Sequence, residues 1–296
     1  MSGMRLRFFH CLLHASQMAL AIGGGCALFT DVPQAEPAHS PELVTVEGRR
    51  VEAVTEGTGT PAVVFESGSN GSSPWEPIES QIAQKTMTLR YQRAGLGRSD
   101  PGPNPRSAAQ VAKELHALLS AKSVRPPYVL VGHSAGGLYV RVFAHMYPKE
   151  IAGLVLVDPA TEELYERMRA EKTTEDVKKM GLLPTVLAEW IALPETIDEA
   201  HRASLPRVPT VVLTSTQPIG QYPLQDDQAM QLWRRWHDQL VARTPGARHI
   251  VVENSNHGSI LMAPVVTEQI LQMVAAARAR NNTAGQELPA TAEQAR

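Results

Sequence analysis

The residue with the clearest chemical potential is Ser134, which stands in the run Gly132-His133-Ser134-Ala135-Gly136. The four residues before this run, 128–131, are apolar and predict a buried strand, and the residues after it are typical of an amphipathic helix. A serine between two glycines at such a strand-to-helix turn is held on strained backbone with its hydroxyl exposed. The pattern therefore predicts Ser134 as a nucleophile.

A serine hydroxyl needs a base that accepts its proton. His257 stands in Ser255-Asn256-His257-Gly258, directly after the apolar run 250–252 and before a helical stretch. His133 is next to Ser134 and is expected to point away from it, and the other histidines lie in helices or away from strand ends. We therefore expect His257 to be the base.

Short β-rich runs alternate with amphipathic helical stretches from about Val44 to Val274. Continuous apolar strands separated by helices predict a mostly parallel sheet with helices on both faces, an α/β fold. The strands are expected at residues 44–46 and 51–54, which form a leading hairpin, and at 62–65, 86–91, 128–131, 154–157, 211–213 and 250–252.

One stretch, residues 161–207, has helical sequence but no strand, and it follows the strand that ends before Asp158. Within it, Leu183, Leu187 and Trp190 share one face of a predicted helix. This stretch is predicted to be a small helical lid inserted into a domain of residues 41–280. We expect those three side chains to line a substrate site.

Composition excludes several kinds of function. Of the 296 residues, 43% are hydrophobic, and the formal net charge of −2 provides no basic field for a nucleic-acid backbone. Both cysteines, Cys11 and Cys26, lie near the start of the chain, so the rest contains no disulfide, thiolate metal site or cysteine nucleophile.

No histidine cluster has the spacing of metal ligands, and the run 67–71 lacks the Gly-x-Gly-x-x-Gly order. We predict neither a metal nor a cofactor.

The first 40 residues are predicted to be a leader and linker. Arg5 and Arg7 precede an apolar stretch, 8–22, and then small residues before Cys26, which is the layout of an export signal or of a lipid-anchored leader with Cys26 as the anchor. Polar residues interrupt the apolar stretch, so export and a cytoplasmic location both stay open. No later segment approaches the ~20 apolar residues that span a bilayer. Residues 281–296 are polar and predict a flexible tail.

The motifs together resemble those of the α/β-hydrolase fold superfamily, in its lid-bearing, esterase-like serine hydrolase group. The resemblance covers residues 44–274 and rests on the run 132–137, the turn Arg93-Ala94-Gly95-Leu96-Gly97-Arg98-Ser99-Asp100, and Ser255-Asn256-His257. The turn at Arg93 is expected to be structural.

The resemblance also implies an oxyanion hole. Many relatives carry His-Gly after the third strand, where this chain has Ser67-Gly68. Backbone donors survive such a change of side chain, so the N–H groups of Ser69 and Ala135 are expected to bind the oxyanion.

The triad acid has two candidate positions under the same resemblance. In many relatives it follows the strand at 211–213, but here the first carboxylates after that strand are Asp226 and Asp227, at a predicted helix start where aspartate commonly caps. The alternative is Asp158, at the end of the preceding strand. We favour Asp158 and keep the later pair open.

The resemblance implies a carboxylic ester hydrolase that works through an acyl-enzyme on a Ser-His-Asp triad, with a hydrophobic small-molecule ester as substrate. Amide, thioester or carbon–carbon bond hydrolysis and cofactor-free peroxidation use the same site and stay open. A rival of another class is a non-catalytic binding protein of this fold, because fold does not fix function. The sequence gives no indication of oligomeric state.

Overall fold

The computed structural model describes residues 40–69 and 71–286 of the chain. The predicted leader, with Cys26 as its lipid anchor, lies outside the described residues, as does the end of the predicted tail. Helix α9 (Pro264–Gln286) continues to Gln286, into the segment that was predicted to be a flexible tail.

The described residues form an eight-stranded sheet in the order β1-β2-β4-β3-β5-β6-β7-β8. β1 and β2 form the predicted hairpin, β2 also runs antiparallel to β4, and all other neighbours are parallel. The predicted α/β architecture with a mostly parallel sheet is therefore confirmed. The strands are β1 (Glu42–Val46), β2 (Arg49–Glu56), β3 (Ala62–Glu66), β4 (Thr88–Tyr91), β5 (Tyr128–His133), β6 (Ile151–Val157), β7 (Thr210–Gln217) and β8 (Ala247–Asn256).

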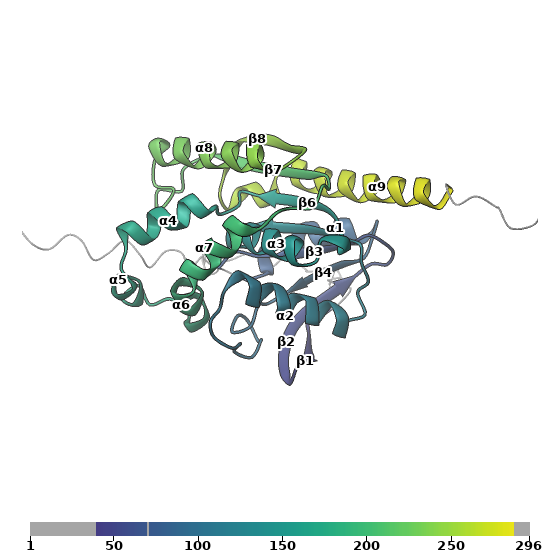
Figure 1. The fold of residues 1–296 in the computed structure, drawn as a ribbon, viewed down its shortest axis with the longest axis horizontal. Coiled ribbons are helices and arrows are strands. Elements are labelled where there is room, and N and C mark those ends of the chain that lie inside the picture. The colour runs from purple at the N-terminus through teal and green to yellow at the C-terminus, as the bar shows by residue number, and fades with distance from the viewer. Residues whose placement is uncertain (1–39, 70, 287–296) are drawn as a thin grey trace, which may run out of the picture. The chain divides into compact units, whose positions relative to one another are not determined.

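Helices connect most of these strands, as parallel pairing requires (Figure 1). Short 3-10 turns occupy Ser73–Trp75, Pro148–Glu150 and Ser259–Met262. The helices, besides α9, are α1 (Glu76–Ala83), α2 (Ala108–Ala121), α3 (Ala135–Met146), α4 (Glu162–Glu171), α5 (Thr174–Lys178), α6 (Pro184–Ile191), α7 (Leu193–Arg202) and α8 (Asp227–Arg243).

The central strands are apolar throughout because both faces of the sheet are covered. In β5, Val129 and Val131 pack in one buried cluster with Ile270 of α9, whereas Leu130 packs in the other with Phe143 of α3. Successive side chains of a strand point to opposite faces, so two layers of helices bury both sets. Each fully buried aliphatic side chain contributes about 1.5–3 kcal/mol.

Helices α4 to α7 all lie between β6 and β7, in the stretch predicted to be an insertion, and Figure 1 shows them gathered at one side of the domain. We call residues 162–202 the α4–α7 segment. It has a small apolar cluster of its own, in which Val177, Trp190, Leu193 and Ile197 are buried. No helix among residues 40–69 and 71–286 combines the length and apolar character needed to cross a membrane.

Candidate active site

Ser134 occupies the tight turn between β5 and α3. Its φ is 55° and its ψ is −127°, a conformation that costs a non-glycine residue of order 1–3 kcal/mol. A Cβ at Gly132 would lie 2.6 Å from the carbonyl oxygen of Gly136, and one at Gly136 would overlap the carbonyl of Glu66. Only glycine fits at both positions, at Gly132 because of the turn itself and at Gly136 because of β3, and Ser134 stays partly exposed.

His257 follows β8 in a turn that its neighbours hold in place. The Asn256 side-chain oxygen accepts hydrogen bonds from the N–H groups of Gly258 and Ser259, at 3.0 and 2.9 Å. The imidazole donates from Nδ1 to Asp158 Oδ2 at 2.7 Å. With the proton on Nδ1, the other ring nitrogen, Nε2, is able to accept one.

Asp158 is fully buried at the end of β6 and its carboxylate accepts four hydrogen bonds. Besides His257, the donors are the N–H of Ser215 at 2.8 Å, the hydroxyl of Ser215 at 2.9 Å and the indole N–H of Trp233 at 2.9 Å. Burial alone would raise the pKa of Asp158, but the hydrogen bond and charge of His257 and the Ser215 N–H bring this pKa well below its ordinary value. The group is held as a carboxylate next to the imidazole.

Ser215 and Trp233 are site residues that the sequence did not reveal. Ser215 ends the buried part of β7, and Trp233 lies on α8, in what the sequence presents as one stripe of a core helix. A buried tryptophan usually finds a partner for its indole N–H. No local pattern identifies that partner as Asp158, which is 75 positions away in sequence.

His133 also has a role that sequence reasoning missed. Its Nε2 donates to the backbone carbonyl of His257 at 2.9 Å, and the two imidazole rings are 4.6 Å apart between centroids. Burial, and then the neighbouring His257, lower the pKa of His133, which keeps the ring neutral. The residue next to Ser134 therefore holds the turn of His257 close to the nucleophile.

The two later aspartates lie at the start of α8. Asp226 is the residue before the helix, and its Oδ1 accepts a hydrogen bond from the N–H of Ala229 at 2.8 Å, while Asp227 is the first helical residue. This is the geometry of an N-cap. The structure brings Asp158, and neither of these two, within hydrogen-bond distance of His257.

The loop after β3 lies against the nucleophile. A Cβ at Gly68 would be 2.9 Å from Ser134 Cβ and 3.3 Å from its hydroxyl oxygen, so the backbone of Gly68 packs directly on Ser134. Ser69 follows in this loop, and Ala135 is the first residue of α3, where a backbone N–H has no acceptor within the helix. The loop that carries Ser69 thus packs, through Gly68, on the turn that precedes Ala135, and the role of the two N–H groups stays a prediction.

The three predicted lining residues of the α4–α7 segment are not equivalent. Trp190 is buried and Leu187 half-buried, and both pack in the segment's own apolar cluster. Leu183 precedes α6 and is 45% exposed. These contacts give Leu187 and Trp190 a packing role, and their part in lining a substrate site stays a prediction.

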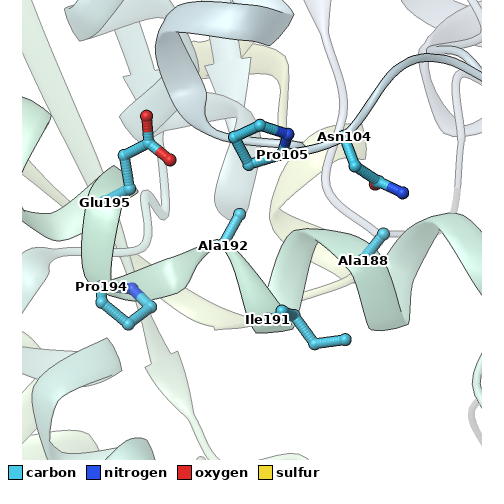
Figure 2. Close-up of a pocket in the computed structure, with 7 residues that line it drawn as sticks. All are labelled: Asn104, Pro105, Ala188, Ile191, Ala192, Pro194 and Glu195. Carbon is cyan, nitrogen blue, oxygen red and sulfur yellow. The ribbon is translucent and has the colours of Figure 1, made fainter.

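A pocket of about 540 Å³ lies beside α6 and α7 (Figure 2). The side chain of Ala192 points toward Pro105, which belongs to the loop before α2. The lining is mostly apolar and consists of Asn104, Pro105, Ala188, Ile191, Ala192, Pro194 and Glu195. Within residues 40–69 and 71–286, no group of three or more His, Cys, Asp or Glu side chains is arranged to hold a metal ion.

Residues 61–183 match the family model of the alpha/beta hydrolase fold. The uncharacterized protein YqjL of Bacillus subtilis is 30% identical over 204 residues, which are 68% of this chain and 78% of YqjL. The chain belongs to the α/β-hydrolase fold family.

Solved structures of this α/β-hydrolase fold show how varied its chemistry is. An esterase from Thermogutta terrifontis superimposes with a TM-score of 0.57 at 19% identity, over 81% of this chain and 98% of the esterase. A haloalkane dehalogenase from Agrobacterium tumefaciens gives the same TM-score, 0.57, at 14% identity, over 79% and 97% of the two chains. Because likeness of this degree reflects fold, the site residues must carry any argument about the reaction.

Proposed function

We propose that the protein is a serine hydrolase that cleaves carboxylic esters through an acyl-enzyme on Ser134. The observation that carries the proposal is the 2.7 Å hydrogen bond from His257 to the fully buried Asp158, next to the strained turn of Ser134. A nucleophile, a base and a group that orients the base are the three parts that acyl transfer needs.

In the first step, His257 takes the hydroxyl proton of Ser134 through Nε2 as the serine oxygen attacks the ester carbonyl carbon. Among the described residues, no hydrogen bond yet joins Ser134 to His257; such bonds are often long in a free enzyme and tighten when substrate binds. Asp158 keeps the imidazole in the required tautomer and stabilises the imidazolium that forms.

The backbone N–H groups of Ser69 and Ala135 stabilise the negative oxygen of the tetrahedral intermediate. Donors of this kind are fixed before the reaction and need no reorganisation when charge develops. The imidazolium then gives its proton to the leaving alcohol. Water attacks the acyl-enzyme in the same way, with His257 as base, and releases the acid and Ser134.

We propose the α4–α7 segment as a lid and hydrophobic esters as the substrate class. Support for the substrate class comes from the exposed Leu183 and Ile191 of this segment, at 45% and 54%. Exposed apolar side chains on a lid commonly meet an apolar ligand or surface.

Two measurements test the proposal. The protein should hydrolyse p-nitrophenyl esters, and a panel of graded acyl lengths should reveal a preference for the longer chains. An organophosphonate probe should label the wild type and the control Ser120→Ala, which alters an exposed serine of α2, but should not label Ser134→Ala. Equal labelling of Ser134→Ala, or no ester turnover by a folded wild type, would favour the non-catalytic binding protein.

A further inference from the structure

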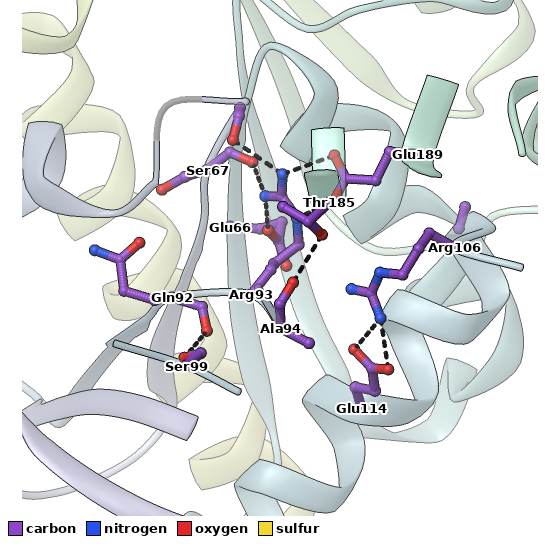
Figure 3. A network of polar contacts seen from close by, with 12 residues as sticks. Glu66, Ser67, Gln92, Arg93, Ala94, Ser99, Arg106, Glu114, Thr185 and Glu189 are labelled. Carbon is purple, nitrogen blue, oxygen red and sulfur yellow. Dashed lines mark hydrogen bonds and ion pairs between the residues drawn. The ribbon is translucent and has the colours of Figure 1, made fainter. Parts of the chain in front are cut away.

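Arg93, in the turn after β4, is a charged side chain with only 1% of its area exposed. The guanidinium lies between the loop after β3 and helix α6, as Figure 3 shows. It also lies over the ring of Tyr139, with the central carbon 5.0 Å from the ring centroid. Tyr139 belongs to α3, the helix that begins directly after Ser134. One side chain thus contacts the loop that packs on Ser134, the helix that follows Ser134, and helix α6.

The guanidinium has five N–H donors, and each has an acceptor. Toward the sheet, Nη1 donates to Glu66 Oε1 at 2.9 Å and to the carbonyl of Ser67 at 2.5 Å, and Nη2 donates to the carbonyl of Gly68 at 3.1 Å. Toward α6, Nε and Nη2 donate to the two carboxylate oxygens of Glu189 at 3.0 and 3.3 Å. A lysine, with three donors on one nitrogen, cannot reproduce this planar set.

The two carbonyls that Arg93 binds determine where the neighbouring N–H groups point. In a planar trans peptide the C=O and the following N–H point in opposite directions. Holding the carbonyl of Gly68 toward Arg93 therefore directs the N–H of Ser69 away from Arg93. Since Gly68 packs directly on Ser134, this orientation is set within the proposed oxyanion loop.

The other side of the guanidinium fixes α6. Thr185, four positions before Glu189 and so on the same face of the helix, donates its hydroxyl proton to the carbonyl of Ala94 at 2.8 Å. Gly95 makes this approach possible, because a Cβ there would lie 2.8 Å from the Thr185 Cβ. Helix α6 is thereby docked on the turn that carries Arg93, through one ion pair and one hydrogen bond.

Stability alone gives a weak reason for such an arrangement, because a buried ion pair is often no more stabilising than well-packed apolar side chains. We propose that Arg93 is a positioning residue that couples α6 to the oxyanion loop, so that the seating of Glu189 determines the orientation of the Ser69 N–H. The inference rests on the proposed function of Ser134. A lid that is out of place would then leave the nucleophile without a correctly directed donor.

The test compares Glu189→Gln with the matched control Glu114→Gln. Glu114 also pairs with a buried arginine, Arg106, at 2.7 and 2.9 Å, yet neither residue contacts the loop after β3 (Figure 3). Both substitutions remove one charge from a buried arginine pair and keep the shape of the side chain. Arg93→Lys is the second variant, which keeps the charge and loses the planar donor set.

The readouts are kcat and KM for p-nitrophenyl butyrate, the affinity for a trifluoromethyl ketone, which forms a tetrahedral oxyanion on the serine, and the Tm. Loss of one oxyanion donor lowers kcat by about 10²–10³. We expect Glu189→Gln and Arg93→Lys to lower kcat by at least about tenfold, with KM changed less and with a parallel loss of ketone affinity. Glu114→Gln should lower Tm by a similar amount and keep kcat within about twofold of the wild type.

Failure of the proposed function and failure of the coupling alone give different results. If the proposed function is wrong, the wild type itself shows no Ser134-dependent phosphonate labelling and no ester turnover. If only the coupling is wrong, the wild type is active and Glu189→Gln and Arg93→Lys lose no more kcat than Glu114→Gln does. A rise in KM with kcat and ketone affinity unchanged would equally overturn the coupling.

Discussion

Asp158 keeps its negative charge in a place from which water is excluded, because four donors surround its two oxygens. Oδ1 accepts from the Ser215 N–H and from Trp233, and Oδ2 accepts from the Ser215 hydroxyl and from His257. The groups that donate to the two oxygens differ in whether they can also accept a hydrogen bond. The donors to Oδ1 cannot reverse, whereas the hydroxyl and the imidazole at Oδ2 can each either donate or accept.

This asymmetry makes Asp158→Asn an informative variant. The amide oxygen can replace Oδ1, and the amide N–H₂ can donate to the Ser215 hydroxyl and to His257, which then takes the wrong tautomer. We expect kcat to fall by roughly 10⁴ while the cooperative urea unfolding transition is retained.

Asp226→Asn is the control for that variant. Asparagine caps a helix about as well as aspartate, so stability and turnover should both stay close to those of the wild type. A large loss of kcat in Asp226→Asn, together with an active Asp158→Asn, would move the triad acid to the later position.

Trp233→Phe tests the indole donor to Asp158. Phenylalanine keeps most of the ring packing but leaves Oδ1 with one donor, and a hydrogen bond to a charged group contributes about 1.5–3 kcal/mol. We expect a lower urea midpoint and a loss of about tenfold in kcat, because a less firmly held carboxylate orients His257 less well. Trp236→Phe, on the same helix and only partly buried, should change neither quantity to that extent. Equal kinetics for the two variants would restrict Trp233 to a packing role.

At the scale of elements, the α4–α7 segment combines an apolar core of its own with contacts to the rest of the domain. Trp190, Leu193 and Ile197 supply the core. Thr185 and Glu189 dock α6 on the Arg93 turn, and Ala188 and Ile191 of the same helix face the pocket. Different faces of α6 therefore make different contacts, because side chains three or four positions apart lie on the same face of a helix.

Trp190→Ala tests whether Trp190 packs within the segment's own cluster or lines the proposed substrate site. Removing a buried tryptophan costs about 3–5 kcal/mol in a well-packed core, so the segment should open to limited proteolysis while the sheet stays protected. Because Trp190 packs within the cluster, we expect the fall in kcat/KM to be similar for short and long p-nitrophenyl esters. A loss confined to long acyl chains would instead support the predicted role of Trp190 in lining the substrate site.

At the scale of the whole molecule, buried acidic groups link stability to pH. Glu162 is 1% exposed and pairs with Arg141 at 2.9 Å and with Arg243 at 2.6 Å, which joins α4 to α3 and α8. Burial would raise the pKa of Glu162, but Arg141 and then Arg243 lower it below its ordinary value. The unfolded chain therefore binds this proton more tightly than the folded protein does.

A depressed pKa in the folded state stabilises the protein above the unfolded pKa, and this contribution is lost as the pH falls through the folded pKa. Glu162→Gln should lower the free energy of unfolding by about 3 kcal/mol at pH 7, because Arg141 loses its charged partner. From about pH 4.3 downward, the difference from the wild type should shrink as Glu162 becomes protonated. Urea unfolding at pH 7, 5 and 3 measures this, and a difference that does not change with pH would contradict the assignment.

Several features of this protein follow from the sequence by itself. The turn at Ser134 is visible in the sequence, because an apolar strand run leads directly into Gly132 and Gly136 on either side of the serine, and an amphipathic helix follows. The apolar runs identify the central strands, since burial on both faces removes the alternation of polar residues. The position of His257 after the last strand is likewise visible along the chain.

The tertiary structure alone decided which of these residues meet. The sequence left Asp158 and the pair Asp226 and Asp227 open; the sheet order then placed the end of β6 next to β7 and near the turn after β8. Arg93 was expected to be a structural turn residue, and its contacts with Glu189 span 96 positions. Periodicity tells which face of an element is buried but not which side chain lies opposite it, because partners remote in sequence are set by strand order and register.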